Sequence, residues 1–291
     1  MAGFATNGRR HLAVALGLLA VHGVPLLAQG VGADGRTVTV RDTADAAAHR
    51  QTLFTKRDAF LAAGFAGLTI AMFPVDRHLA AVVRDDDLKT NKFIDNAARK
   101  IEYIAAPGAF IIGGSLYLFG RSQSHKDLAD LGWHGTEAVI LATGVTTILK
   151  GALGRSRPFV SADTNPHDFK LGGGFGNDSR QSFPSGHSTT AFAVASAVTS
   201  EVRRTMPEKL WVVAPVMYGG ATLVGLSRMY HDNHWASDVV LGAAIGTFSG
   251  LKVVRYSHAH PDNKLDKWIL GASIIPDVHG GGTLAFTMPV P

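Results

Sequence analysis

Six apolar blocks recur between residues 59 and 251 and restrict what this chain can fold into. Each block is 12 to 18 residues long and rich in Ala and Leu, which favours helix over strand. The blocks are Ala59–Val75, Tyr103–Gly120, Ala138–Leu149, Ser188–Ser200, Leu210–Ser227 and Val239–Leu251. No internal repeat or low-complexity linker separates them. The pattern predicts an all-α fold, a helical bundle of about six core helices with short β-like termini.

The first 28 residues have the three parts of an export signal. Arg9 and Arg10 precede the apolar run Leu12–Val21, and the small residue Ala28 follows where a peptidase would cut. An uncleaved N-terminal anchor is the alternative. In both cases the chain enters or crosses a membrane.

The rest of the chain divides into three parts. Residues 29–57 form a polar N-terminal segment in which Thr37–Val40 alternates like a short strand. Residues 58–256 form the helical domain, and residues 257–291 form a C-terminal tail with the strand-like run Thr283–Thr287.

Membrane association is expected, but block length does not show whether the helices span the bilayer. Three blocks reach 17 or 18 residues, near the lower limit for a span, and the other three have 12 or 13. The mean hydropathy is +0.13. If the signal were cleaved and every block spanned, alternation would end the third block in the cytoplasm. A bilayer-spanning bundle and a soluble exported globule therefore both remain open.

Charge and cysteine content exclude several classes of function. The net charge of +5 is spread along the chain with no Lys/Arg run, so no nucleic-acid partner is expected. A diffuse positive field suits anionic phosphates or an anionic membrane surface. The chain has no cysteine, which excludes thiolate catalysis, zinc-thiolate sites and disulfides.

The first candidate site segment follows the third apolar block and contains Lys150, Arg157 and Pro158. If the helix continues through Gly151 and Gly154, positions 150 and 157 lie two turns apart on one face. Two cations on one face can clamp a phosphate dianion. The alternative is a basic helix end that complements the dipole or anchors the helix at a membrane.

The second segment is Pro184-Ser185-Gly186-His187, at the predicted start of the next helix. A helix N-terminus offers unpaired N–H groups to an anion. Ser185 would donate its hydroxyl, Gly186 would let the backbone approach closely, and His187 would act as a proton donor. The alternative is a capped helix with an unrelated histidine.

The third segment contains Arg228, His234 and Asp238. On a helix, His234 and Asp238 would share a face because they are four residues apart. The carboxylate could then hold one ring nitrogen and leave the other as a nucleophile, with Arg228 as a third cation. A structural helix pair is the alternative.

Together the three segments resemble the signature of the type 2 phosphatidic acid phosphatase superfamily, which is similar to bacterial class A acid phosphatases and vanadium haloperoxidases. The resemblance covers Lys150 to Asp238, and the adjacent helices extend it over about Ala59 to Leu251. It implies a phosphohistidine on His234, Asp238 orienting it, and His187 protonating the leaving oxygen. It also implies phosphate binding, without a metal or other cofactor, by Lys150, Arg157, Ser185, Gly186 and Arg228.

The resemblance makes this chain a candidate phosphohydrolase that cleaves a phosphate ester or diphosphate, with a phosphorylated lipid as the expected substrate partner. It would work in a bacterial-type cell envelope, in the membrane or periplasm, with its active site outside the cytoplasm. The alternatives are a vanadate-dependent haloperoxidase, a soluble exported acid phosphatase for small monoesters, and a non-catalytic envelope protein. The sequence fixes neither the substrate nor the oligomeric state.

Histidines elsewhere suggest little chemistry. A metal site built from His231, His234, His258 and His260 would need His234 for a different task and lacks a helical His pair at four-residue spacing. We interpret His78, His125 and His134 as surface residues. The connection Phe159–Phe183 is either a lid or rim beside the site or an exposed linker.

Overall fold

The computed structural model describes residues 53–105, 108–160, 165–260, 263, 264, 266, 269, 272–276 and 282–286. The predicted export signal and the strand at residues 37–40 lie outside them. The helices are α2 (Lys56–Met72), α3 (Asp76–Val83), α4 (Asp86–Lys89), α5 (Lys92–Ala105), α6 (Gly108–Ser122), α7 (Lys126–Leu153), α8 (Gly186–Thr205), α9 (Leu210–Tyr230) and α10 (Ala236–Ala259). Strands β1 (Ala272–Pro276) and β2 (Gly282–Phe286) pair antiparallel.

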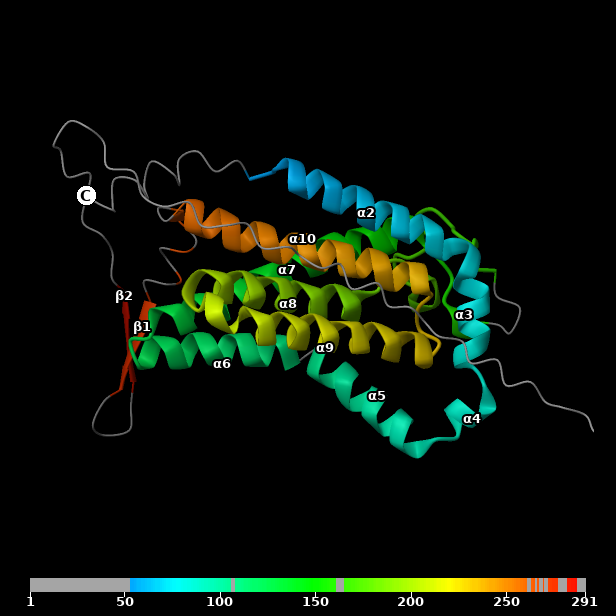
Figure 1. The fold of residues 1–291 in the computed structure, drawn as a ribbon, viewed down its shortest axis with the longest axis horizontal. Helices are drawn as coiled ribbons and strands as arrows, with labels where there is room; N and C mark the ends of the chain where they lie inside the picture. The colour runs from blue at the N-terminus through cyan, green and yellow to red at the C-terminus, as the bar shows by residue number, and fades with distance from the viewer. Residues whose placement is uncertain are drawn as a thin grey trace, which may run out of the picture. The chain divides into compact units, whose positions relative to one another are not determined.

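The all-α prediction is confirmed. Four of the apolar blocks each lie within one α-helix. The first continues from α2 into the 3-10 helix Phe73–Val75, and the second begins at the end of α5 and ends in α6. The polar stretch after α2 contains the additional short helices α3 and α4. Helices α6 to α10 run side by side along the long direction of Figure 1, with α2 beside α10.

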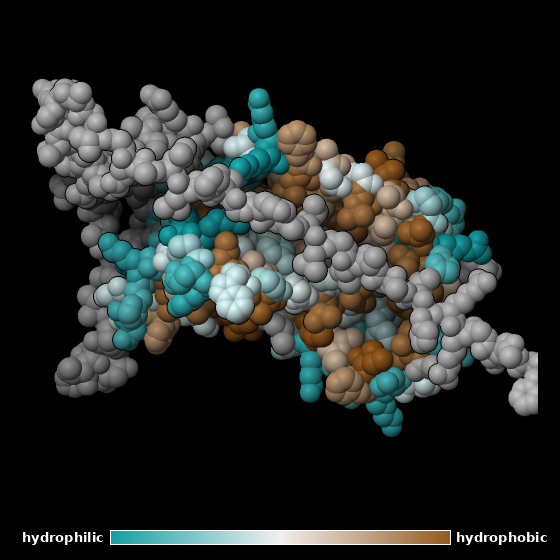
Figure 2. Space-filling view, viewed as in Figure 1, coloured by the Kyte–Doolittle hydropathy of each residue, from teal (hydrophilic) through white to brown (hydrophobic). Residues whose placement is uncertain are grey.

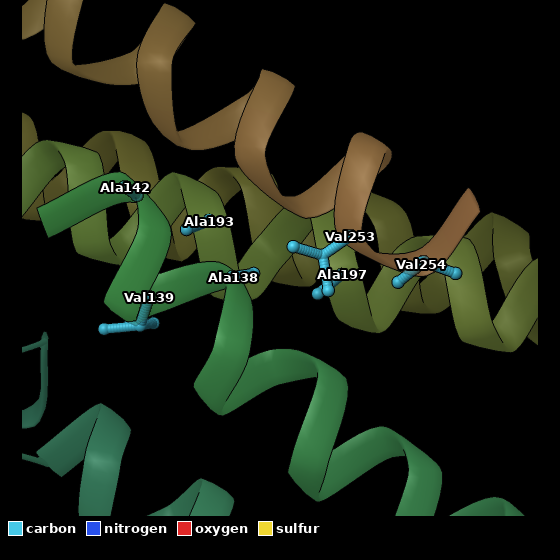
Figure 3. Close-up of a cluster of buried hydrophobic side chains, with 7 residues drawn as sticks. All are labelled: Ala138, Val139, Ala142, Ala193, Ala197, Val253 and Val254. Carbon is cyan, nitrogen blue, oxygen red and sulfur yellow. The ribbon is translucent and has the colours of Figure 1, made fainter. Parts of the chain in front are cut away.

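Helix α8 is the centre of the bundle, because α7, α9 and α10 all pack on it. Its contacts with α7 and α10 are made by small side chains (Figure 3). That buried cluster consists of Ala138, Val139, Ala142, Ala193, Ala197, Val253 and Val254. Small residues allow helix backbones to approach closely, so this seam fixes α7, α8 and α10 against one another.

Three glycines of α10 lie directly on the backbone of α8. A Cβ at Gly242 would lie 2.5 Å from Ser185 O, and one at Gly246 would lie 2.2 Å from Thr189 O. A Cβ at Gly250 would lie 2.6 Å from the carbonyl oxygen of Ala193. These glycines recur every four residues, on one face of the helix. No side chain separates the two helices there, and their N-terminal ends are held together.

Among the described residues, four helical segments are long and apolar enough to cross a membrane: Lys56–Val83, Lys126–Leu153, Pro207–Tyr230 and Ala236–Ala259. A fifth span results if the bent pair Lys92–Tyr103 and Gly108–Ser122 counts as one. Large apolar side chains such as Phe60, Ile70 and Val216 are exposed, and brown, apolar surface covers much of the visible face in Figure 2. Apolar exposure on this scale is typical of a membrane protein.

Candidate active site

The three candidate segments meet at one end of the bundle. Ser185 N donates to Asp238 O at 3.0 Å, which joins the start of α8 to the start of α10. Lys150 Nζ, near the end of α7, donates to the carbonyl oxygen of Gln181. Arg157 Nη1 donates to Asn233 Oδ1 at 3.2 Å, next to His234. Segments up to 88 residues apart therefore surround one site.

His234 is buried, and its Nδ1 lies 2.7 Å from the carbonyl oxygen of Ser182. Because a carbonyl only accepts, this contact places the ring proton on Nδ1. Nε2 then carries the free lone pair. Burial, together with the charges of Lys150 and Arg157, lowers the pKa of His234 to about 3, so the ring is neutral at neutral pH.

Asp238 supports His234 less directly than expected. The two residues do not share a helix face, because α10 begins at Ala236 and His234 precedes it. Asp238 Oδ2 lies 3.5 Å from His234 Nδ1, farther than Ser182 O. The same carboxylate accepts from Trp235 N at 2.7 Å, so Asp238 also caps the helix that follows the histidine.

Arg155 and Asp76 were missed in the sequence analysis. The Arg155 guanidinium donates from Nη1 to Asp238 and from Nη2 to Asp76 Oδ2 at 2.7 Å, and none of the three side chains is exposed. Asp76 also accepts from Ser237 N at 2.9 Å. The rings of Phe73, Phe169, Phe183 and Trp235 surround Arg155. These contacts tie Asp238 to α3 and to the α7–α8 connection.

Lys150 and Arg157 do not lie on one continuous helix, as the sequence analysis expected. Helix α7 ends at Leu153, because Gly154 adopts the left-handed conformation (φ 56°) that terminates helices. Arg157 therefore stands on the following loop, where it donates to Asp178 Oδ1 at 2.7 Å. Burial lowers the pKa of Arg157, although Asp178 opposes that effect.

Arg228, at the end of α9, is the third cation. Its Nη1 donates to Glu102 Oε2 at 2.6 Å, and Glu102 also contacts His231 Nδ1 at 2.8 Å. Its Nε is buried and has no hydrogen-bond partner among the described residues. A buried guanidinium N–H without an acceptor is costly unless an anion meets it. Glu102 is a third residue, after Arg155 and Asp76, that local sequence patterns did not reveal.

The N-terminus of α8 carries the remaining predicted residues. Ser185 is the N-cap, and its Oγ lies 2.9 Å from Ser188 Oγ. A Cβ at Gly186 would meet only Lys150 Cε, at an ordinary 3.7 Å, so protein packing does not require glycine there. Burial and the Arg228 charge lower the pKa of His187 to about 4.

The connection between the first two segments packs closely on the end of α7. A Cβ at Gly174 would lie 2.0 Å from Lys150 O. Lys170 N donates to Gly154 O, and Ser156 N donates to Asp168 O. In residues 165–183 the connection is thus part of the wall around Lys150 and Arg157.

Comparison with known proteins decides the family. The PAP2 superfamily model matches residues 132–262, which include every predicted site residue. The chain is also 32% identical over 173 residues to a lipid A 1-phosphatase of Rhizobium etli, a match that covers 57% of this chain and 70% of that protein. The chain belongs to the PAP2 superfamily. The resemblance found in the sequence is confirmed, and this PAP2 chain is a phosphatase.

Other similarities are shorter or more distant. A lipid A 1-phosphatase of Porphyromonas gingivalis is 42% identical over 69 residues, which are 24% of this PAP2 chain and 15% of that protein. A transmembrane PAP2-type phosphatidylglycerolphosphate phosphatase from Bacillus subtilis has a TM-score of 0.49 at 20% identity, covering 72% of this chain and 99% of that one. Aquifex aeolicus LpxE has a TM-score of 0.42 at 22% identity, covering 62% and 96%.

Proposed function

We propose that this PAP2 chain hydrolyses the phosphate ester or diphosphate of a membrane lipid through a phosphohistidine on His234. The observation that carries the proposal is the contact of His234 Nδ1 with Ser182 O, 2.7 Å long, which leaves Nε2 as the nucleophile. A neutral ring at neutral pH fits this role.

In the first step, His234 Nε2 attacks phosphorus in line with the leaving oxygen. The P–N bond forms as the P–O bond to the lipid breaks. Lys150, Arg157, Arg228, the Ser185 hydroxyl and the backbone N–H of Gly186 bind the equatorial oxygens, on which negative charge is spread. His187 donates a proton to the departing oxygen.

In the second step, water attacks phosphorus on the opposite side of the P–N bond. His187, now without its proton, accepts one from the water. Inorganic phosphate leaves and His234 is neutral again. The proposed cycle uses only protein groups and water.

Two observations favour a lipid substrate. The exposed apolar side chains of the candidate spans fit a chain that meets its substrate in a bilayer, and they argue against a soluble acid phosphatase. An apolar cavity of about 510 Å³ also lies among α5, α6, α7, α8 and α9. Ile101, which adjoins Glu102, and Val224, one turn before Arg228, both line it. An acyl chain in this cavity would leave its headgroup at the cations.

The relatives suggest the first substrate to test, since two curated relatives are named lipid A 1-phosphatases. We propose a lipid phosphate of that kind, processed with the active-site end of the bundle outside the cytoplasm. With the predicted export signal, this orientation requires an even number of crossings before the end of α7, as when Lys56–Val83 and α7 span the bilayer and the bent pair α5–α6 does not.

The test uses the full chain purified in detergent. Phosphate release is compared between a lipid 1-phosphate and a short-chain phosphomonoester, with and without chelator. We expect the lipid to be the preferred substrate and the chelator to have no effect. His234→Ala should abolish turnover, and no phosphoenzyme should be trapped with this variant. A phosphoenzyme that persists in His234→Ala would refute the mechanism. Halide oxidation with added vanadate, without phosphate release, would support the haloperoxidase alternative.

A further inference from the structure

A second cluster of chemically competent side chains lies at the other end of the bundle. It consists of His134 on α7, Glu201 on α8 and His258 on α10, whose donor atoms all lie within 4.8 Å of one another. Along the helices, it is about 24 Å from Lys150 and about 30 Å from Asp238, at 1.5 Å per residue. In Figure 1, α10 runs between the two ends. The cluster therefore takes no part in the phosphate chemistry.

Glu201 lies between the two imidazoles. Its Oε1 is 2.6 Å from His134 Nδ1 and 2.9 Å from His258 Nε2. The imidazole rings meet edge to face, with their centroids 5.2 Å apart. Two imidazoles and one carboxylate are a common donor set for Zn²⁺, whose ligand atoms lie about 3.3 Å apart in a tetrahedral site. Small side-chain shifts would bring these donors around one ion.

The surroundings of His134 resemble those of a metal-bound histidine. The side chain is 2% exposed, and its Nε2 has no hydrogen-bond partner among the described residues. Asp266 Oδ2 lies 3.8 Å from this nitrogen, and Asp266 itself is held by Trp133 Nε1 at 2.9 Å. An outer carboxylate facing the second ring nitrogen is what zinc-bound histidines usually have.

Buried carboxyl groups and a neighbouring pocket also favour a metal ion in this cluster. One turn after His134, Glu137 Oε2 is buried without a hydrogen-bond partner among the described residues. With Glu201 and Asp266, the cluster thus holds three carboxyl groups near two imidazoles, and a cation would offset their repulsion. A pocket of about 600 Å³ lined by Glu201, His125 and Asp127 gives an ion and a water ligand a route from the surface.

We propose that His134, Glu201 and His258 form a structural site for Zn²⁺ or a similar divalent transition metal. The ion would join α7, α8 and α10 at the end of the bundle opposite the active site. Since the three ligands come from three helices, binding stabilises the folded bundle and not the unfolded chain.

The test uses the full chain purified with a tag that contains no histidine. Protein equilibrated with Zn²⁺ and desalted should retain about one zinc per chain, measured by elemental analysis. Zinc at a hundredfold excess over its Kd should raise the Tm by roughly 5–10 °C over chelator-treated protein, whereas Mg²⁺ should not. Co²⁺ should give the visible absorption of a tetrahedral site.

His258→Gln changes the most exposed ligand, so this variant should fold even though it loses zinc and the Tm shift. His260→Gln is the matched control, because His260 is exposed near the same helix end and should keep both. Glu201→Gln should also lose zinc. Wild-type protein without bound zinc and without a Tm shift would overturn the proposal. So would zinc retained at the wild-type level by both His258→Gln and Glu201→Gln. The cluster would then be a hydrogen-bonded His–Glu–His network.

Discussion

Arg155 and Asp238 form an ion pair in which neither side chain is exposed to solvent. The pair lies next to His234, because Asp238 Oδ2 is 3.5 Å from His234 Nδ1. Asp76 contacts the other side of the Arg155 guanidinium at 2.7 Å. A single arginine thus neutralises two buried carboxylates and fixes the one nearest to the nucleophile.

Arg155→Ala should therefore destabilise the protein strongly. It leaves Asp76 and Asp238 buried without a counter-charge, which costs about 3–5 kcal/mol. Unfolding in mixed micelles measures this loss. Arg180→Ala is the control, because its pair with Asp168 is partly exposed and should contribute about 0–1 kcal/mol. Equal losses in the two variants would contradict the assigned importance of Arg155.

Asp238→Asn should reduce kcat about a hundredfold and still form the phosphoenzyme. Removing the orienting carboxylate of a hydrolase triad is more damaging when it leaves the histidine in the wrong tautomer. Here Ser182 O holds the Nδ1 proton of His234 at 2.7 Å without help from Asp238. Rapid-quench measurement of phosphoenzyme formation checks this. Complete loss of the phosphoenzyme in a folded Asp238→Asn variant would show that Ser182 O alone does not hold His234 in the reactive tautomer.

Glu102→Gln should lower KM for the phosphate substrate about fivefold. Glu102 accepts from Arg228 at 2.6 Å and so competes with a phosphate for that guanidinium. Asp95→Asn is the matched control, because Asp95 contacts His231 at 3.3 Å without contacting Arg228. The comparison needs KM and kcat for all three proteins. An increase in KM for Glu102→Gln would mean that the carboxylate positions Arg228 rather than competing for it.

His187→Asn should affect poor leaving groups most. Loss of a general acid should slow alkyl phosphates about 10² to 10⁴-fold, and nitrophenyl phosphate, whose leaving group needs little protonation, much less. The pKa of His187, lowered to about 4, means that its proton is lost above that pH in the free enzyme. A bound phosphate dianion opposes the Arg228 charge and raises this pKa. The alkaline limb of kcat should consequently lie at higher pH than that of kcat/KM, and coincident limbs would argue against His187 as the acid.

The helical fold could be predicted from the sequence because its signal is local. Each apolar block is long enough to specify a helix, and the motif residues mark helix ends. The three segments that the structure brings together could also be found, since residues 150–157, 184–187 and 228–238 each carry a recognisable pattern. Their catalytic roles, and the absence of a metal from the phosphate site, stay predictions.

Contacts between distant segments could not be predicted in this way. Asp76 and Arg155 are 79 residues apart, and Glu102 and Arg228 are 126 apart, so no local spacing reveals either pair. The surface interpretation was wrong for His134, which is buried, whereas His78 and His125 are exposed as expected. The sequence did contain an indication that His134 is buried, because Ala138 and Ala142 follow it at four-residue intervals on the same buried helix face.

The glycines at 242, 246 and 250 limit how this enzyme can change its substrate. Where two helices touch through main-chain atoms, any added side chain would push Ser185 away from Asp238 and disturb the reacting geometry. The side of the phosphate site where α8 meets α10 therefore cannot be enlarged to fit a bulkier headgroup. New specificities must instead arise from α5 and α9, where apolar side chains can be exchanged without moving the nucleophile.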